Sequence, residues 1–158
     1  MTTFTKWFLL NAVVITGGLL AETKGAISLM IDNDSSYLTI LIMALYVAVS
    51  SFVGRLCYLS DKLNPDKPKD EEERNRLLKK SDAGWFASEH FFSLGLLGTI
   101  IGLCMATTTS LNADAPLKEI IAGLKVGLNT AFYTTICGIV FSLPLQIQLM
   151  ILKSKLEK

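Results

Sequence analysis

The chain has 158 residues, of which 51% are hydrophobic and only 18% are charged. Soluble domains carry about 25% charged residues, and most charges of this chain fall between residues 55 and 89 or after residue 152. This distribution argues against an ordinary soluble domain and indicates a membrane protein, while the net charge of +1 offers no polybasic surface for nucleic acid.

Four apolar segments predict helices that cross a membrane, which takes about 20 mostly apolar residues. The first, residues 7–21, is the shortest; no A-x-A cleavage site follows it, so we expect it to be retained as a membrane helix. The others are residues 37–59, 91–111 and 126–152. The sequence therefore predicts an all-α membrane protein with four transmembrane helices in a single membrane domain, residues 1–158.

The positions of lysine and arginine predict the orientation, because these residues favour the cytoplasmic side. They gather before the first helix, between the second and third, and in the tail: Lys6; Lys62, Lys67, Lys69, Arg74, Arg76, Lys79 and Lys80; Lys153, Lys155 and Lys158. We expect both termini and a short loop at residues 60–90 to be cytoplasmic. Its charges from Asp70 onward indicate a solvated helix, or alternatively a docking surface for a cytoplasmic partner.

Small and hydroxyl-bearing residues form one face of each of the last two predicted helices. The faces hold Gly95, Gly98, Thr99, Gly102, Ala106 and Thr109 in the third, and Gly127, Thr130, Ala131, Thr134, Gly138 and Ser142 in the fourth, with Thr135 at the flank. Small residues let membrane helices pack closely, and threonine hydroxyls can also serve an ion in a narrow passage. The periodicity leaves both interpretations open: packing alone, or a polar pathway.

Two motifs on these faces resemble a known family. The first motif, residues 95–102, reads Gly-Leu-Leu-Gly-Thr-Ile-Ile-Gly. The second motif is a set of spaced residues in the fourth predicted helix: Gly127, Ala131, Thr135, Gly138 and Pro144. They resemble the last two helices of the MotA/TolQ/ExbB proton channel family, in the same order and separated by a short outward loop. The resemblance covers residues 93–145.

This resemblance implies a ring of five subunits around two copies of a single-span partner, each carrying one membrane aspartate. The chain would be the ring subunit of a motor driven by H⁺ or Na⁺ in the bacterial inner membrane, without a cofactor. We expect Thr99, Thr130, Thr134 and Thr135 to line the ion pathway. The helix-packing and pore face would comprise Gly95, Gly98, Gly102, Ala106, Gly127, Ala131, Gly138 and Pro144.

Neither of the last two predicted helices contains Asp, Glu, Lys, Arg or His, as expected of a subunit whose partner supplies the carboxylate. TolQ and ExbB commonly have glutamate where this chain has Thr130. Two other functions stay open: a self-sufficient homo-oligomeric ion channel and a structural membrane scaffold.

Two polar residues, Glu89 and His90, precede the third predicted helix. Histidine titrates near neutral pH, so the pair is either an interfacial feature or part of a proton exit. The sequence shows no nucleophile and base arrangement, metal cluster or phosphate loop, and we expect no catalytic residue, no metal site and no enzymatic activity.

Overall fold

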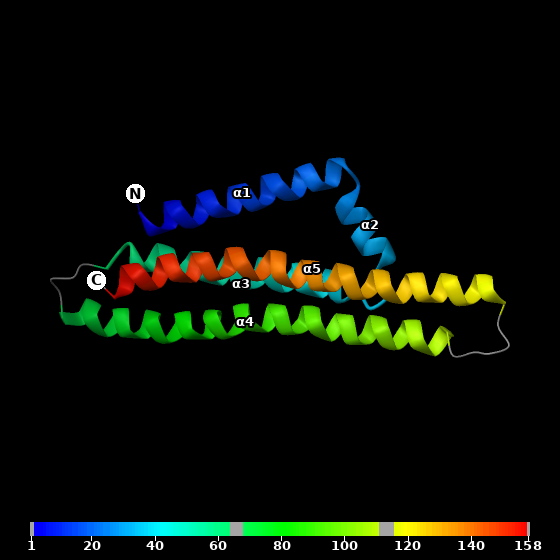
Figure 1. Cartoon of the computed structure of the whole chain (residues 1–158). Helices are drawn as coiled ribbons and strands as arrows, with labels where there is room; N and C mark the ends of the chain where they lie inside the picture. Colours follow the sequence, from blue (N-terminus) through cyan, green and yellow to red (C-terminus); the bar gives the residue numbers. More distant parts are fainter. Residues whose placement is uncertain (1, 64–67, 111–115, 158) are drawn as a thin grey trace.

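The computed structural model describes residues 2–63, 68–110 and 116–157, and nearly all of them are helical. The helices are α1 (Thr3–Thr23), α2 (Ala26–Asn33), α3 (Leu38–Ser60), α4 (Pro68–Ser110) and α5 (Leu117–Leu156) (Figure 1). All of them except α2 are long and apolar enough to cross a membrane. The chain is therefore all-helical in the described residues, with the four candidate spans that the sequence predicts.

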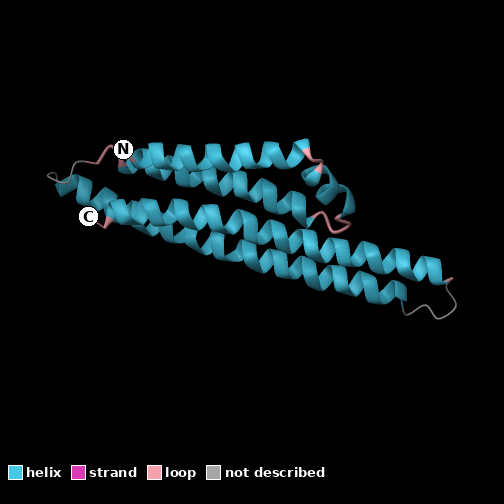
Figure 2. Cartoon of the chain, turned by 45° about the horizontal axis from the view of Figure 1, so that its top comes forward, coloured by secondary structure: helices cyan, strands magenta, loops and turns pink. Residues whose placement is uncertain are grey.

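Helix α5 is the centre of the bundle and packs against α1, α3 and, most extensively, α4. The two chain ends lie at the same end of the bundle, which we call the terminal end (Figure 1). At the opposite end, the α4–α5 hairpin projects beyond α2 and α3 (Figure 2). The hairpin thus forms a two-helix layer, and the other helices pack along it.

Within the predicted cytoplasmic connection at residues 60–90, the charged helix expected from Asp70 onward begins at Pro68 and runs without a break into residues 91–110 as part of α4. A helix satisfies its backbone hydrogen bonds internally, so it can pass from water into lipid without a break. Asp70 and Glu71 lie in its first turn, where their negative charge is favourable at the positive end of the helix dipole.

The remaining helices match the predicted segments with shifted ends. Segments 7–21 and 37–59 correspond to α1 and α3, and segment 126–152 lies within the longer α5. Helix α5 continues through Pro144. The predicted end of the third helix, at residue 111, lies outside the described residues.

A leucine core explains why α4 and α5 extend toward the terminal end. Leu77 of α4 packs in one cluster with Leu149, Leu152 and Leu156 of α5, and each of these side chains is at most 2% exposed. Helices of about 40 residues reach about 60 Å, roughly twice the thickness of the hydrocarbon core. The ends of α4 and α5 that extend beyond a hydrocarbon core of this thickness are therefore held by their own packing.

Candidate functional site

The small faces of α4 and α5 pack against each other within one chain. A Cβ atom built on Gly138 would lie 2.7 Å from the Phe91 carbonyl oxygen, and one built on Gly102 would lie 2.6 Å from the backbone nitrogen of Ala131. Real Cβ atoms essentially never come within 3.0 Å of another heavy atom in this way. The backbones of the two helices are therefore in direct contact, as small residues allow in membranes.

The seven predicted packing residues other than Pro144 take part in this contact. Gly95 faces the Thr134 carbonyl and Gly138, Gly98 faces the Thr134 side chain, and Gly127 faces Ala106. Pro144 is half-buried nearer the terminal end of α5. The side chain of Thr109 lies outside the described part of the chain.

Thr134 fills the space over Gly98 and is completely buried. Its hydroxyl lies 2.8 Å from the Thr130 carbonyl oxygen and 3.2 Å from the Ala131 carbonyl oxygen, both in its own helix. This hydroxyl is thus satisfied by the helix backbone, and the side chain packs between α4 and α5.

Thr99 and Thr135 form a hydroxyl pair between the two helices. Their side-chain oxygens hydrogen-bond to each other, and both also lie within hydrogen-bonding distance of the Gly95 carbonyl oxygen, at 3.2 and 3.3 Å. Both threonines are half-buried, and their neighbours Leu96 and Phe132 are exposed. The pair therefore lies at an edge of the α4–α5 contact that no other described helix covers.

Thr130 lies elsewhere, beneath the turn between α2 and α3. It is completely buried; its hydroxyl accepts a hydrogen bond from the Ser35 backbone N–H at 3.2 Å and lies 3.4 Å from the Asn33 carbonyl oxygen. The four predicted pathway threonines thus divide. Thr99 and Thr135 reach one open edge, whereas Thr130 and Thr134 are enclosed within the chain.

The same turn is organised by Asp34, a carboxylate that is only 3% exposed. Its oxygens accept hydrogen bonds from the backbone N–H groups of Ser36 and Thr39 at 2.9 and 2.8 Å, which caps α3. Burial raises the pKa of Asp34, but hydrogen bonds from Ser36 and Thr39 outweigh this effect and leave the pKa below its ordinary value. The side chain therefore stays ionised and structural.

A buried polar network that the sequence reasoning missed joins α1, α3 and α5. The Ser50 hydroxyl lies 2.9 Å from Asn11 Oδ1 and 3.0 Å from Gln148 Oε1, and the Gln148 amide donates to the Tyr46 hydroxyl at 3.4 Å. Polar side chains that bond across membrane helices stabilise their association. Isolated Asn, Ser and Gln residues in three apolar segments were the available signal, but only the fold shows that they meet.

The adjacent residues Glu89 and His90 point to different sides of α4. The Trp85 indole N–H donates to Glu89 Oε1 at 3.0 Å, whereas the His90 ring stacks on Phe86 with ring centroids 3.9 Å apart. Glu89 lines a groove between α4 and α5 together with Gln146 and four other residues. The two side chains therefore have different neighbours, and only Glu89 lines this groove.

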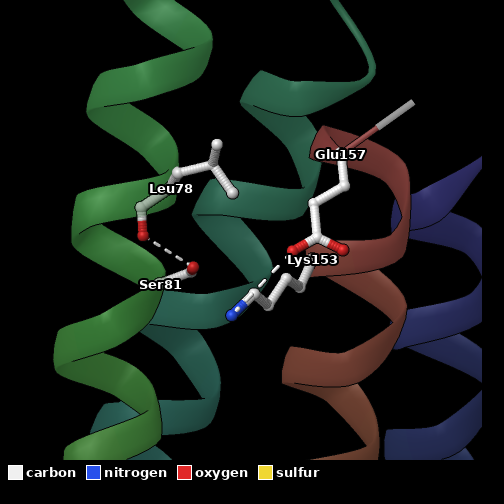
Figure 3. A network of polar contacts seen from close by, with 4 residues as sticks. All are labelled: Leu78, Ser81, Lys153 and Glu157. Atoms are coloured by element: carbon white, nitrogen blue, oxygen red, sulfur yellow. Dashed lines mark hydrogen bonds and ion pairs between the residues drawn. The ribbon is translucent and has the colours of Figure 1, made fainter.

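The terminal end carries exposed charges on α5. Lys153 and Glu157 form an ion pair at 3.9 Å, beside the stretch of α4 where the Ser81 hydroxyl donates to the Leu78 carbonyl oxygen at 2.7 Å (Figure 3). Both partners of the ion pair are more than half exposed. Such a pair contributes little to stability.

Asp61, which follows α3, fixes the beginning of α1. Its carboxylate oxygens accept hydrogen bonds from the backbone N–H groups of Thr3 and Phe4 at 2.9 and 2.7 Å. Burial raises the pKa of Asp61, but these hydrogen bonds and the charge of Lys155 outweigh it and leave the pKa below its ordinary value. Among the residues that the structure describes, no cluster of His, Cys, Asp and Glu could hold a metal ion.

These features define a multi-pass helical membrane protein built on a close-packed helix pair with hydroxyls at its open edge. A sequence model of the MotA/TolQ/ExbB proton channel family matches residues 71–158, which include all of α5 and nearly all of α4. Because the match covers more than half of the chain, the chain belongs to the MotA/TolQ/ExbB proton channel family. No curated protein and no solved structure matches the chain. The family is one of proton channels and not a class of enzymes.

Proposed function

We propose that this chain is the ring-forming subunit of an ion-driven membrane motor. Five copies surround two copies of a single-span partner that carries a membrane aspartate, and the flow of H⁺ or Na⁺ is converted into mechanical work. Family membership supports ion conduction in general. The observation that supports this particular pathway is the Thr99–Thr135 hydroxyl pair at the open edge of the α4–α5 contact.

The chemistry of that edge fits a subunit that works with a partner. Hydroxyl oxygens can replace part of the hydration shell of a cation or order water in a narrow passage. The membrane-spanning parts, residues 91–110 of α4 and 126–152 of α5, contain no Asp, Glu, Lys, Arg or His. An ion relay across a membrane normally uses an ionisable side chain, so in this proposal the partner provides it.

In the proposed arrangement, the terminal end of the bundle faces the cytoplasm from the bacterial inner membrane. The Lys and Arg residues at both chain ends and between α3 and α4 support this orientation. Ions would then enter from the end where the α4–α5 hairpin projects and leave at the terminal end.

The direct test is the substitution Thr135→Val in the complex purified from its native membrane and reconstituted into vesicles. Valine keeps the shape of threonine and removes the hydroxyl, so ion flux should fall about tenfold or more while assembly is unchanged. The matched control is Thr108→Val, because Thr108 is exposed and bonds only to carbonyl oxygens of its own helix. Equal flux in wild type and Thr135→Val would overturn the pathway.

Native mass spectrometry of the same complex tests the assembly. The proposal expects five copies of this chain with two copies of a single-span protein that carries a membrane aspartate. A homo-oligomer that conducts alone would instead indicate a self-sufficient channel. A non-conducting homo-oligomer would indicate a structural scaffold, which the close glycine contacts between α4 and α5 would also suit.

A further inference from the structure

A groove lies between α4 and α5, on the part of each membrane-spanning segment that is nearer the terminal end. Its volume is about 450 Å³, and it is lined by Glu89 and Phe92 of α4 and by Ile139, Ser142, Leu143 and Gln146 of α5. Three of these six side chains are polar although the surrounding helix surface is apolar. A groove that only contacted lipid would not require a carboxylate, an amide and a hydroxyl together.

The polar side chains of the groove are held in place by hydrogen bonds. The Ser142 hydroxyl donates to the Ser88 carbonyl oxygen at 3.0 Å, and the Gln146 amide donates to the Ser142 hydroxyl at 3.2 Å. On the facing helix, the Trp85 indole N–H donates to Glu89 Oε1 at 3.0 Å. The carboxylate is therefore oriented before any ion arrives.

The groove and the threonine pair lie on the same side of the α4–α5 hairpin. On α4, Phe92 lies three residues after Glu89, and Thr99 lies seven residues after Phe92, so the three share one side of the helix. On α5, Gln146 lies eleven residues after Thr135, which places both on one side of that helix. Ten residues of helix span about 15 Å. Glu89 therefore lies about 15 Å nearer the terminal end than the threonine pair, along the proposed direction of ion flow.

Glu89 is the only ionisable side chain that lines this groove among the described residues. Toward the terminal end, the next hollow, which Trp85 also lines, contains Asp82 of α4 and Lys153 of α5. Lys153 is paired with Glu157 (Figure 3). His90 faces another side of α4, where its ring stacks on Phe86.

We propose that Glu89 is the acceptor for the translocated cation at the terminal-end mouth of the pathway, a role that rests on the function proposed above. For a proton, an oxygen of the ionised carboxylate takes up H⁺ from water on the threonine side and releases it to water beyond the mouth. The side chain thus returns to the anion in each cycle. For Na⁺, the same carboxylate binds the ion electrostatically, in a groove that Ser142 and Gln146 also line.

The test compares Glu89→Gln, Glu89→Asp and Asp82→Asn with wild type in the reconstituted native complex. Glutamine keeps the size of the side chain and an acceptor for Trp85 but cannot bind a proton or carry charge. A pH-sensitive dye inside the vesicles reports H⁺, and radioactive sodium reports Na⁺. We expect Glu89→Gln to lower the flux of the carried ion about tenfold or more, Glu89→Asp to restore part of it, and Asp82→Asn to leave it unchanged.

Including Thr135→Val separates this inference from the proposed function. Low flux in Thr135→Val with normal flux in Glu89→Gln overturns the role of Glu89 and leaves the pathway standing. Normal flux in Thr135→Val overturns both. An equal loss in Asp82→Asn and Glu89→Gln would indicate a general effect of surface charge, and would also overturn the specific role of Glu89.

Discussion

Thr99 of α4 and Thr135 of α5 hydrogen-bond to each other, and both hydroxyls approach the same carbonyl oxygen, that of Gly95. This arrangement depends on the absence of a side chain at Gly95, where a Cβ atom would lie 3.2 Å from the Thr135 Cα atom. The glycine contacts and the hydroxyl pair are therefore two parts of one structure. Close packing brings the hydroxyls together, and they lie at the edge of the contact rather than inside it.

Replacing Thr99 should separate the function of its hydroxyl from its structural contribution. One hydrogen bond between membrane helices contributes about 0.6 kcal/mol and at most about 1.7 kcal/mol, so Thr99→Val should assemble normally and melt within a few degrees of wild type. Ion flux in vesicles should nevertheless fall about tenfold. Thr99→Ser retains the hydroxyl and should keep most of the flux; an equal loss in both variants would argue against the hydroxyl as the functional group.

Adding one methyl group at Gly138 should destabilise the α4–α5 contact. The new Cβ atom would lie 2.7 Å from the Phe91 carbonyl oxygen, and because that atom belongs to the backbone, the helices must move apart. Overpacking of this kind costs about 1–3 kcal/mol. The measurement is the thermal unfolding of the purified protein in detergent.

The matched control for this substitution is Gly17→Ala in α1. No atom lies within 4 Å of a Cβ built on Gly17, and alanine is the better helix former by about 1 kcal/mol. Gly17→Ala should therefore unfold at the same temperature as wild type or higher. If both variants unfolded alike, the close contact at Gly138 would not limit stability.

Replacing Gln148 with leucine should loosen the packing of α1 and α3 on α5. The substitution removes the hydrogen bonds of Gln148 with Ser50 and Tyr46, although both hydroxyls keep Asn11 as a partner. Each lost hydrogen bond costs about 0.5–1.5 kcal/mol. We expect a lower unfolding temperature for Gln148→Leu. Gln146→Leu, two residues earlier on the groove side, should change the unfolding temperature much less.

Acid should release the beginning of α1 through Asp61. Because the pKa of Asp61 is below its ordinary value of 3.8 in the folded protein, its stabilising contribution is fully present above about pH 4. The contribution is lost as the pH falls through the lower pKa of the folded state. The emission of Trp7 in a Trp85→Phe background should therefore be constant at neutral and mildly acidic pH and change below pH 4.

Asp61→Asn is the control for this titration. Asparagine cannot ionise, so the emission of Trp7 in this variant should already be altered at neutral pH and should show a smaller change on acidification. An acid transition identical in wild type and Asp61→Asn would assign it to another group, such as Asp34.

The sequence by itself determines the helices and their faces. Uncharged runs of sufficient length predict the four spans. Because a helix has 3.6 residues per turn, the small residues in segments 91–110 and 126–152 lie on one face of each helix. The motifs at residues 95–102 and 127–144 indicate the family, and the match to residues 71–158 confirms it. These features are local, since each depends only on residues a few turns apart.

Only the tertiary structure decides what covers each face. The periodicity places Thr130, Thr134 and Thr135 within five residues of one another, but Thr130 lies under the α2–α3 turn, Thr134 over Gly98, and Thr135 at an open edge. Glu89 likewise lines the groove that α5 completes, whereas the adjacent His90 contacts Phe86 of its own helix. Periodicity fixes which residues share a face of one helix, whereas the neighbour of that face comes from a distant part of the chain, and its position depends on how all the helices pack together.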